Sequence, residues 1–414
     1  MKKNLIALAI FGAFSGAALA QSNVTLYGIL DVNFQYNDPD ASGASSVRGI
    51  GSGHQSGSRW GIRGSEALSP NLNAVFTLEG GYSTDTGAMG QAFPPGNVAV
   101  PANTTTAQRL FGRQVWGGLA GGWGTIVAGR VATFSSGTGS FDMFGNVDPF
   151  LTGFGDSSLG STFTSAAALR VDNAALYQSP SFGGFKFGAG YSFQGVGSEA
   201  AGSGNNNRVW FLGANFARGP FFAAVTYDTF DIADAGIPAG TAAFPAIAAN
   251  VSDQKSLQIG ATFDLKFLKL HGAYAKEDDV RYVVGTLGAP STSFVPTFDS
   301  GADADAWMAG VTVPLLGGAL LGSYQRRNGD SVDVCTGTLV AGACPAASAF
   351  NRSRDVEIWA VAYTYPLSRR TNLYINYSDA DVDNRSGPVA GGTGVSTISA
   401  AGRKQYTAGF RHLF

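Results

Sequence analysis

The residue types that most often carry catalysis are scattered along this sequence. Its three histidines, His54, His271 and His412, lie far apart along the chain, so no pair has the spacing of metal ligands. The sequence contains neither a Gly-x-Ser-x-Gly nucleophile elbow nor a glycine-rich phosphate-binding motif. It therefore predicts no metal site and no cofactor, and it gives catalysis little support.

Cys335 and Cys344 are the only two cysteines, and they bracket a short segment rich in glycine, alanine and threonine. In an oxidising compartment two such thiols would close a small loop as a disulfide. A metal site is the weaker alternative, because two thiols with no histidine nearby cannot complete a tetrahedral ligand set. We therefore predict a Cys335–Cys344 disulfide.

The composition excludes several classes of protein. Glycine accounts for 58 of 414 residues, roughly twice the usual share, and only 14% of residues are charged. This is unlike an ordinary soluble enzyme. Intrinsic disorder is also excluded, because 44% of residues are hydrophobic and the net charge is only −2. A nucleic-acid partner would require a concentrated basic excess, which the chain lacks.

The first twenty residues have the features of an export signal. Lys2 and Lys3 precede a short apolar core from Leu5 to Phe14, and Ala18-Leu19-Ala20 places small residues just before Gln21. An uncleaved anchor is the alternative, but this core is shorter than the ~20 residues that a spanning helix needs. We predict a cleaved signal at residues 1–20 and a mature domain at residues 21–414.

The mature chain alternates with a period of two residues, as β-strands do. From Val24 to Tyr36, one face is apolar and the other is mixed. Sixteen such strands are expected: Val24–Tyr36, Arg59–Ser65, Asn73–Tyr82, Arg113–Leu119, Thr125–Arg130, Arg170–Gln178, Phe185–Phe193, Arg208–Phe216, Phe221–Tyr227, Ser256–Phe263, Lys269–Lys276, Asp305–Val313, Ala319–Arg326, Val356–Tyr365, Thr371–Ser378 and Lys404–Phe414.

Short turns and long loops alternate between these strands. Seven short and eight long connections place both chain ends on the short-turn side, and an even strand number lets an antiparallel sheet close on itself. The third long loop, Val131–Leu169, is the longest. A soluble sandwich also alternates, but its connections would not sort so regularly by length. We therefore predict an all-β, 16-stranded antiparallel transmembrane β-barrel.

Aromatic residues near the strand ends support the membrane interpretation, because aromatic girdles form where such a barrel meets the lipid headgroups. The residues concerned are Tyr36, Tyr82, Trp116, Tyr177, Tyr227, Tyr365 and Phe414. A barrel of this size is also wide enough to hold water, so we expect the inward side chains to be solvated.

Several segments resemble the general porins of Gram-negative outer membranes, specifically the β-proteobacterial trimeric type. The segments that carry the resemblance are Val24-Thr25-Leu26-Tyr27-Gly28, Ser58-Arg59-Trp60-Gly61-Ile62-Arg63-Gly64-Ser65-Glu66, Arg170-Val171-Asp172-Asn173 with Tyr177-Gln178-Ser179-Pro180, Tyr365-Pro366-Leu367-Ser368-Arg369-Arg370-Thr371-Asn372, and Gly409-Phe410-Arg411-His412-Leu413-Phe414. The resemblance covers the whole mature chain. It implies short periplasmic turns, long extracellular loops, a third loop folded into the barrel, and Phe414 as the signal that the barrel-assembly machinery reads.

The resemblance also implies a narrow section of the pore with a basic wall. Arg59, Arg113 and Arg170 match the basic cluster of the family, and Arg63 and Arg130 are less certain neighbours. Strand parity agrees, because Arg59 and Arg63 lie on the face opposite Trp60 and Ile62, Arg113 opposite Trp116, and Arg170 opposite Tyr177. Guanidinium suits this task because it stays charged at any physiological pH.

Acidic residues are expected to face these arginines. Glu79 matches an acidic wall residue, and Asp142, Asp148 and Asp156 are the acids of the third long loop. Opposed charges across a narrow gap create a transverse field that penalises large apolar solutes and lets small ions and polar molecules pass.

The resulting hypothesis is a homotrimeric outer-membrane channel for passive diffusion that prefers small anions. Its expected partners are outer-membrane lipid, lipopolysaccharide, the barrel-assembly machinery, small ions and polar solutes, with no nucleic acid. Two alternatives remain open: a barrel enzyme such as a lipase or protease, whose site is assembled from loops, and a structural or adhesin barrel with a plugged lumen.

Overall fold

The computed structural model describes residues 23–40, 45–89, 109–163, 170–195, 197–199, 201, 206–231, 253–280, 302–330, 332–335, 349–388 and 402–414. The expected signal at residues 1–20 lies outside these ranges, as does Cys344. Because Cys344 is not described, the disulfide stays a prediction. Within the described part of the chain, no helix is long and apolar enough to cross a membrane.

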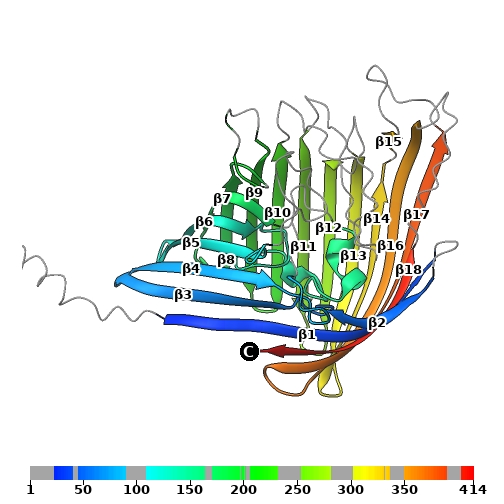
Figure 1. Ribbon diagram of the computed structural model, residues 1–414, viewed down its shortest axis with the longest axis horizontal. Helices are drawn as coiled ribbons and strands as arrows, with labels where there is room; N and C mark the ends of the chain where they lie inside the picture. Colours follow the sequence, from blue (N-terminus) through cyan, green and yellow to red (C-terminus); the bar gives the residue numbers. More distant parts are fainter. Residues whose placement is uncertain are drawn as a thin grey trace, which may run out of the picture.

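The chain forms one antiparallel sheet that closes on itself as a barrel (Figure 1). Its wall strands are β1 (Asn23–Pro39), β3 (Arg59–Ser69), β4 (Leu72–Gly81), β5 (Gln114–Gly121), β6 (Gly124–Ala132), β7 (Arg170–Gln178), β8 (Phe185–Ser192), β9 (Arg208–Arg218), β10 (Phe221–Asp231), β11 (Gln254–Asp264), β12 (Lys269–Val280), β13 (Ala302–Leu315), β14 (Gly318–Gly329), β16 (Ala349–Pro366), β17 (Thr371–Pro388) and β18 (Arg403–Leu413). Each pairs with the next, and β1 pairs with both β18 and β3, which closes the ring.

Two further short strands, β2 (Val47–Ser52) and β15 (Val332–Cys335), extend existing places in the wall. β2 pairs with the C-terminal part of β1, residues 32–37, while β3 pairs with its N-terminal part, residues 23–29. β15 pairs with β16 beyond the part that β14 covers. The predicted sixteen-stranded antiparallel barrel is therefore confirmed. The two additions were missed because they lie inside segments that the sequence indicated as loops.

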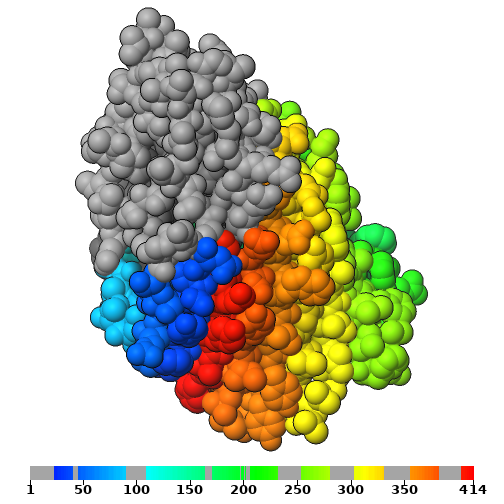
Figure 2. Space-filling view, turned by 90° about the vertical axis from the view of Figure 1, so that its right-hand side faces the viewer, coloured from blue at the N-terminus to red at the C-terminus, as the bar shows by residue number. Residues whose placement is uncertain are grey.

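The two faces of the wall differ as the alternation predicts. Large apolar side chains such as Leu26, Phe34, Ile259 and Trp359 are exposed on the outside, and Figure 2 shows the outer surface running without a break from β1 in blue to β18 in red and on through β17. The inward face carries polar residues such as Asp31. This arrangement suits a barrel whose outside meets lipid.

The third long loop, described at 133–163, lies inside the barrel. Three 3-10 turns, η1 (Gly145–Val147), η2 (Gly155–Ser157) and η3 (Leu159–Ser161), carry it across the lumen. Glycines on the wall make room: a Cβ at Gly260 would lie 2.4 Å from Val147, and one at Gly213 would lie 2.8 Å from Phe134. The expected inward fold of this loop is confirmed.

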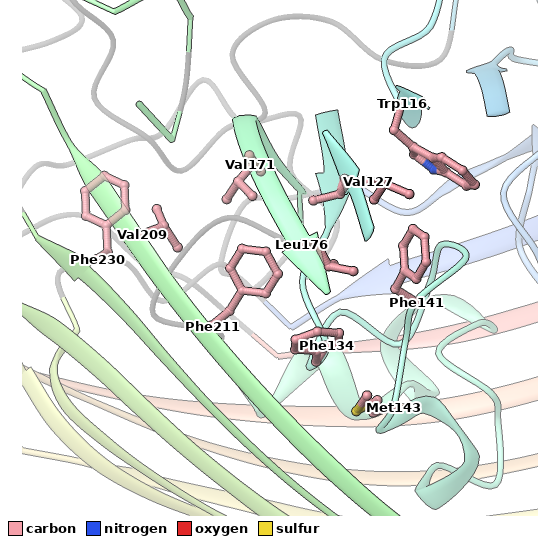
Figure 3. Packing of buried hydrophobic residues seen from close by; sticks show 12 residues of the cluster. Trp116, Val127, Phe134, Phe141, Met143, Val171, Leu176, Val209, Phe211 and Phe230 are labelled. Atoms are coloured by element: carbon pink, nitrogen blue, oxygen red, sulfur yellow. The ribbon is translucent and has the colours of Figure 1, made fainter. Parts of the chain in front are cut away.

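One side of the lumen is packed with apolar side chains, as Figure 3 shows. Phe134 and Met143 of the third long loop meet Leu176, Val209 and Phe211, which point inward from β7 and β9. The expectation of solvated inward residues is therefore wrong on this side, because the loop supplies an apolar partner for them.

Trp116 also departs from the expectation that it faces lipid. It is 9% exposed, its ring lies 5.1 Å from that of Phe141, and its indole N–H donates to Gln114 at 3.1 Å. Trp116 therefore belongs to the packed interior and not to an interfacial girdle.

Candidate functional site

The centre of the site is an ion pair between β4 and the start of β5. Arg113 donates from Nε to Oε1 of Glu79 at 2.7 Å, and the Tyr27 hydroxyl donates to Oε2 of the same carboxylate at 2.9 Å. Arg113 also donates to the Thr138 hydroxyl at 3.0 Å, which links the wall to the third long loop. Both partners of the ion pair are almost fully buried, so Glu79 fixes the direction of the Arg113 guanidinium.

Arg59 and Arg63 on β3 flank this pair. Arg59 donates from Nε to the Gly57 carbonyl at 2.9 Å, and the Arg63 guanidinium lies 5.0 Å from the centre of the Tyr27 ring, a cation–π distance. Tyr27 also contacts Glu79, so Arg63 lies on the same inner face of the wall as Glu79. Arg59 shares the strand parity of Arg63, and both arginines therefore point inward as predicted.

A second carboxylate, Asp172, organises the arginines on the next strands. Arg130 of β6 reaches Oδ1 of Asp172 at 2.6 Å, and Arg109 binds both oxygens at 2.8 and 2.9 Å. Arg170, two residues before Asp172, lies within electrostatic range of Arg113 and Arg130. All five arginines and Glu79 are therefore brought together.

Arg109 and Asp172 belong to the site although they were not predicted from the sequence. For Asp172 a signal existed, because it shares the parity of Arg170 and lies in one of the segments that carry the family resemblance. Arg109 follows a long loop and belongs to no alternating strand, so no periodicity marked it.

Asp142 and Asp148 turn towards the backbone of their own loop. Asp142 accepts N–H groups from Gly137 at 2.7 Å and Gly145 at 2.8 Å. Burial raises the pKa of Asp142 to about 6, against the opposing effect of these donors.

Asp148 is fully buried and accepts three N–H groups, from Phe150, Thr152 and Leu159, each at 2.9 Å. Burial likewise raises the pKa of Asp148 to about 6. The two carboxyl groups thus hold the shape of the third long loop.

Asp156 lies at the far end of the loop, where η2 packs against β16 and β17. It forms a buried ion pair with Arg403 of β18. Burial raises the pKa of Asp156, although Arg403 opposes the shift. Nearby, Phe154 packs edge-on against His54 and Tyr374. This contact closes the loop against the opposite part of the wall.

The inner wall therefore has an excess of positive charge at the site. Six guanidinium groups, of Arg59, Arg63, Arg109, Arg113, Arg130 and Arg170, surround two carboxylates, Glu79 and Asp172. Within the described ranges, no group of three histidine, cysteine, aspartate or glutamate side chains is arranged to hold a metal ion. Such an excess of positive charge can attract and orient anions inside the barrel.

Comparisons with known proteins agree with this geometry. A family described as Gram-negative porin matches residues 5–385. An outer membrane porin protein of Bordetella pertussis is 32% identical over 406 residues, which cover 90% of this chain and 93% of that protein. The anion-selective porin from Comamonas acidovorans has the same fold, with a TM-score of 0.65 and 21% identity over 95% of this chain and all of that one. The trimer form of OmpT from Vibrio cholerae matches with a TM-score of 0.55 and 14% identity, covering 95% of this chain and 99% of that one.

Proposed function

This chain belongs to the Gram-negative porin family, and we propose that its channel favours small anions. It is an outer-membrane channel for the passive diffusion of small hydrophilic solutes. The observation that carries the anion preference is the excess of guanidinium groups over carboxylates on the inner wall around Arg113.

The position of these charges matters more than the net charge of the chain. Charges act on an ion within about a Debye length, ~8 Å at physiological salt, so carboxylates on distant loops are largely screened. We propose Arg59, Arg113 and Arg170, with Arg63 and Arg130 beside them, as the basic wall of the narrowest section. Glu79 is its acidic member.

The loop acids support the same sign of selectivity. The carboxylate oxygens of Asp142 and Asp148 accept hydrogen bonds from backbone N–H groups, and Asp156 forms an ion pair with Arg403. We infer that these three residues shape the third long loop and contribute little negative charge to the passage itself.

We propose a homotrimer, assembled by the barrel-assembly machinery and embedded in lipid and lipopolysaccharide. The trimeric state of the Vibrio cholerae structure of the same fold supports this. Phe414 is suited to the role of assembly signal, since it ends the closing strand and exchanges backbone hydrogen bonds with Gly28 of β1 at 3.0 and 3.1 Å.

We also infer that the chain is a channel without catalytic activity. His54 stacks on Tyr374, His271 lies 2.9 Å from the Val147 carbonyl oxygen, and His412 lies 2.9 Å from the Thr371 hydroxyl. Each histidine thus has a structural contact. A lipase and a protease assay on the purified protein would reveal an enzyme if this inference is wrong.

The anion preference is tested by the reversal potential of the channel in a planar bilayer under a salt gradient. We expect an anion-selective value for the native protein and a shift towards cations for Arg113→Ser, because one fixed positive charge is lost and Glu79 loses its ion-pair partner. Arg218→Ser, on an exposed turn, is the matched control and should not change the potential. An unchanged potential in Arg113→Ser would remove that residue from the narrowest section.

A further inference from the structure

A cavity of about 420 Å³ lies at the periplasmic rim, and none of the arginines of the cluster lines it. Its lining comes from the β13–β14 turn, the end of β16, the β16–β17 turn with the start of β17, the end of β18, and Gln55. Both turns lie side by side at the bottom of Figure 1, in yellow and orange.

The cavity opens on the inside of the barrel. Ala319 shares the inward parity of Leu321, Thr364 that of Ala362, and Asn372 that of Tyr374, and all three reference side chains are buried in the interior. The cavity is therefore a side chamber of the passage and not a groove facing lipid.

Three arginines, Arg369, Arg370 and Arg411, line this cavity, and no carboxylate is among the lining side chains. Its other polar side chains are neutral: Gln55, Thr364, Ser368, Thr371 and Asn372. The ion pairs formed within the described part of the chain include none of the three arginines. Moreover, Nε of Arg411 is buried and has no hydrogen-bond acceptor there.

One acid of the barrel wall acts on Arg411 from outside the cavity lining. Asp31 lies within electrostatic range of Arg411, but it accepts the Tyr374 hydroxyl at 2.6 Å and the Ser56 N–H at 2.7 Å. Asp31 does not line the cavity. These neutral donors leave the negative charge of Asp31 in place, so Asp31 offsets one of the three guanidinium charges and the chamber keeps an excess of positive charge.

Hydrogen bonds hold the walls of the chamber in place. The Asn372 amide donates to Gln55 at 2.7 Å, the Leu413 N–H donates to the Arg370 carbonyl at 2.8 Å, and the Thr371 hydroxyl lies 2.9 Å from Nδ1 of His412. The backbone that carries the arginines is thus fixed before any ligand arrives, which reduces the ordering cost of binding.

We propose that this chamber binds a small oxyanion, a phosphate or a small dicarboxylate, at the periplasmic end of the passage. Guanidinium groups present paired N–H donors that match carboxylate and phosphate oxygens, and the volume falls within the range of small-molecule sites, roughly 300–1,000 Å³. Arg411 is also within electrostatic range of Arg59. An anion that leaves the arginine cluster would therefore encounter a second positively charged site before it reaches the periplasm.

The test is a calorimetric titration of the purified, detergent-solubilised full barrel with inorganic phosphate at low ionic strength. We expect saturable binding that weakens at least about tenfold in the Arg369→Gln/Arg370→Gln double variant, because the variant removes two charged hydrogen-bond donors of the anion. Arg218→Gln, on the β9–β10 turn of the same rim, is the matched control and should bind phosphate like the native protein. Both variants change exposed turn residues, and the heat-dependent gel mobility of the barrel confirms that they fold.

Two outcomes would overturn the proposal. One is phosphate affinity that survives in the double variant but is lost in Arg113→Ser, because the phosphate would then bind at the arginine cluster. The other is an equal loss in the double variant and in Arg218→Gln, because the effect would then be the general charge of the rim. Arg369→Lys/Arg370→Lys should recover part of the affinity.

The proposal stands apart from the anion preference of the channel. If the reversal potential of the native protein is cation-selective while phosphate binding depends on Arg369 and Arg370, the proposed selectivity fails and the chamber remains. If the potential is anion-selective and the double variant binds phosphate normally, the proposed binding site in the chamber is wrong and the proposed anion preference of the channel stands.

Discussion

Buried carboxyl groups in the third long loop combine two opposing demands. The N–H groups that point at Asp148 favour the carboxylate, whereas complete burial favours the neutral acid, and burial prevails. The same balance holds at Asp142. Each group accordingly has a pKa of about 6 in the folded protein, above the ~3.9 of a free aspartate.

We therefore predict that the third long loop becomes less stable as the pH rises from about 4 to about 6. In this window the folded state binds more protons than the unfolded state, so the free energy of unfolding falls with pH. Cleavage of the loop by an added protease, and current noise in single channels, should both increase across the window.

Asp142→Asn/Asp148→Asn removes the titrating groups and should flatten this pH dependence. Asp85→Asn, on an exposed part of another loop, is the control and should keep the native profile. A native loop whose protease sensitivity is constant from pH 4 to pH 7 would contradict the assignment.

At the same scale, the side-chain directions of the arginines could be predicted and that of Trp116 could not. Alternation divides a strand into two faces, and a charged group such as Arg59 cannot face lipid, so its direction is decided. For tryptophan both environments are acceptable, and the choice depends on Phe141, which belongs to a loop whose path the strand pattern does not contain. Arg113 precedes β5, so its inward direction comes from Glu79 and not from parity with Trp116.

At the scale of elements, the third long loop is fastened to the wall at both ends. Near its start, Arg113 bonds Thr138, and near its far end Arg403 pairs with Asp156 while Ser157 donates to Asn376 at 2.9 Å. The two contacts at the far end join parts of the chain more than two hundred residues apart, so no local pattern predicts them. The inward fold itself came from the family resemblance.

We predict that the Asp156–Arg403 pair couples the loop to β18. Removing one partner leaves a buried charge uncompensated, at a cost of about 3–5 kcal/mol. Arg403→Gln alone and Asp156→Asn alone should each lower the temperature at which the barrel loses its compact mobility on a gel. The double variant should lose less than the sum of the two, and strictly additive losses would show that the pair is not coupled.

The disulfide is an element-scale prediction that concerns Cys335 and Cys344. The interval between them is short, so the stabilisation should be small, about 2 kcal/mol, and the barrel should tolerate reduction. Thiol labelling of the denatured, unreduced protein should find no free cysteine. Two labelled cysteines would disprove the bond.

At the scale of the whole molecule, the closed barrel could be predicted because both features that define it are visible in short stretches of the sequence. Period-two alternation gives each strand, and the regular exchange of short turns and long loops gives their order. The half-filled lumen could not be predicted, because it depends on how one loop meets β6 to β10. Val127, Val209 and Phe230 are apolar yet buried, and they belong to one cluster with Phe134, Phe141 and Met143 of the third long loop.

Whether the channel prefers anions or cations is also a property of the whole molecule, because the charges near the narrow section differ in sign from the net charge of the chain. Removal of the predicted signal with Lys2 and Lys3 would make the mature chain more acidic than the net charge of −2 of the full sequence, yet the inner wall around Arg113 is basic. At 1 M salt the Debye length is ~3 Å and at 0.1 M it is ~10 Å, so distant carboxylates contribute more at the lower concentration. On the proposal that the arginines line the passage itself, we predict that the reversal potential stays anion-selective at both concentrations. If the channel instead changed to cation selectivity at 0.1 M, the carboxylates outside the narrow section would be the dominant charges, and the arginine wall would not determine which ions pass.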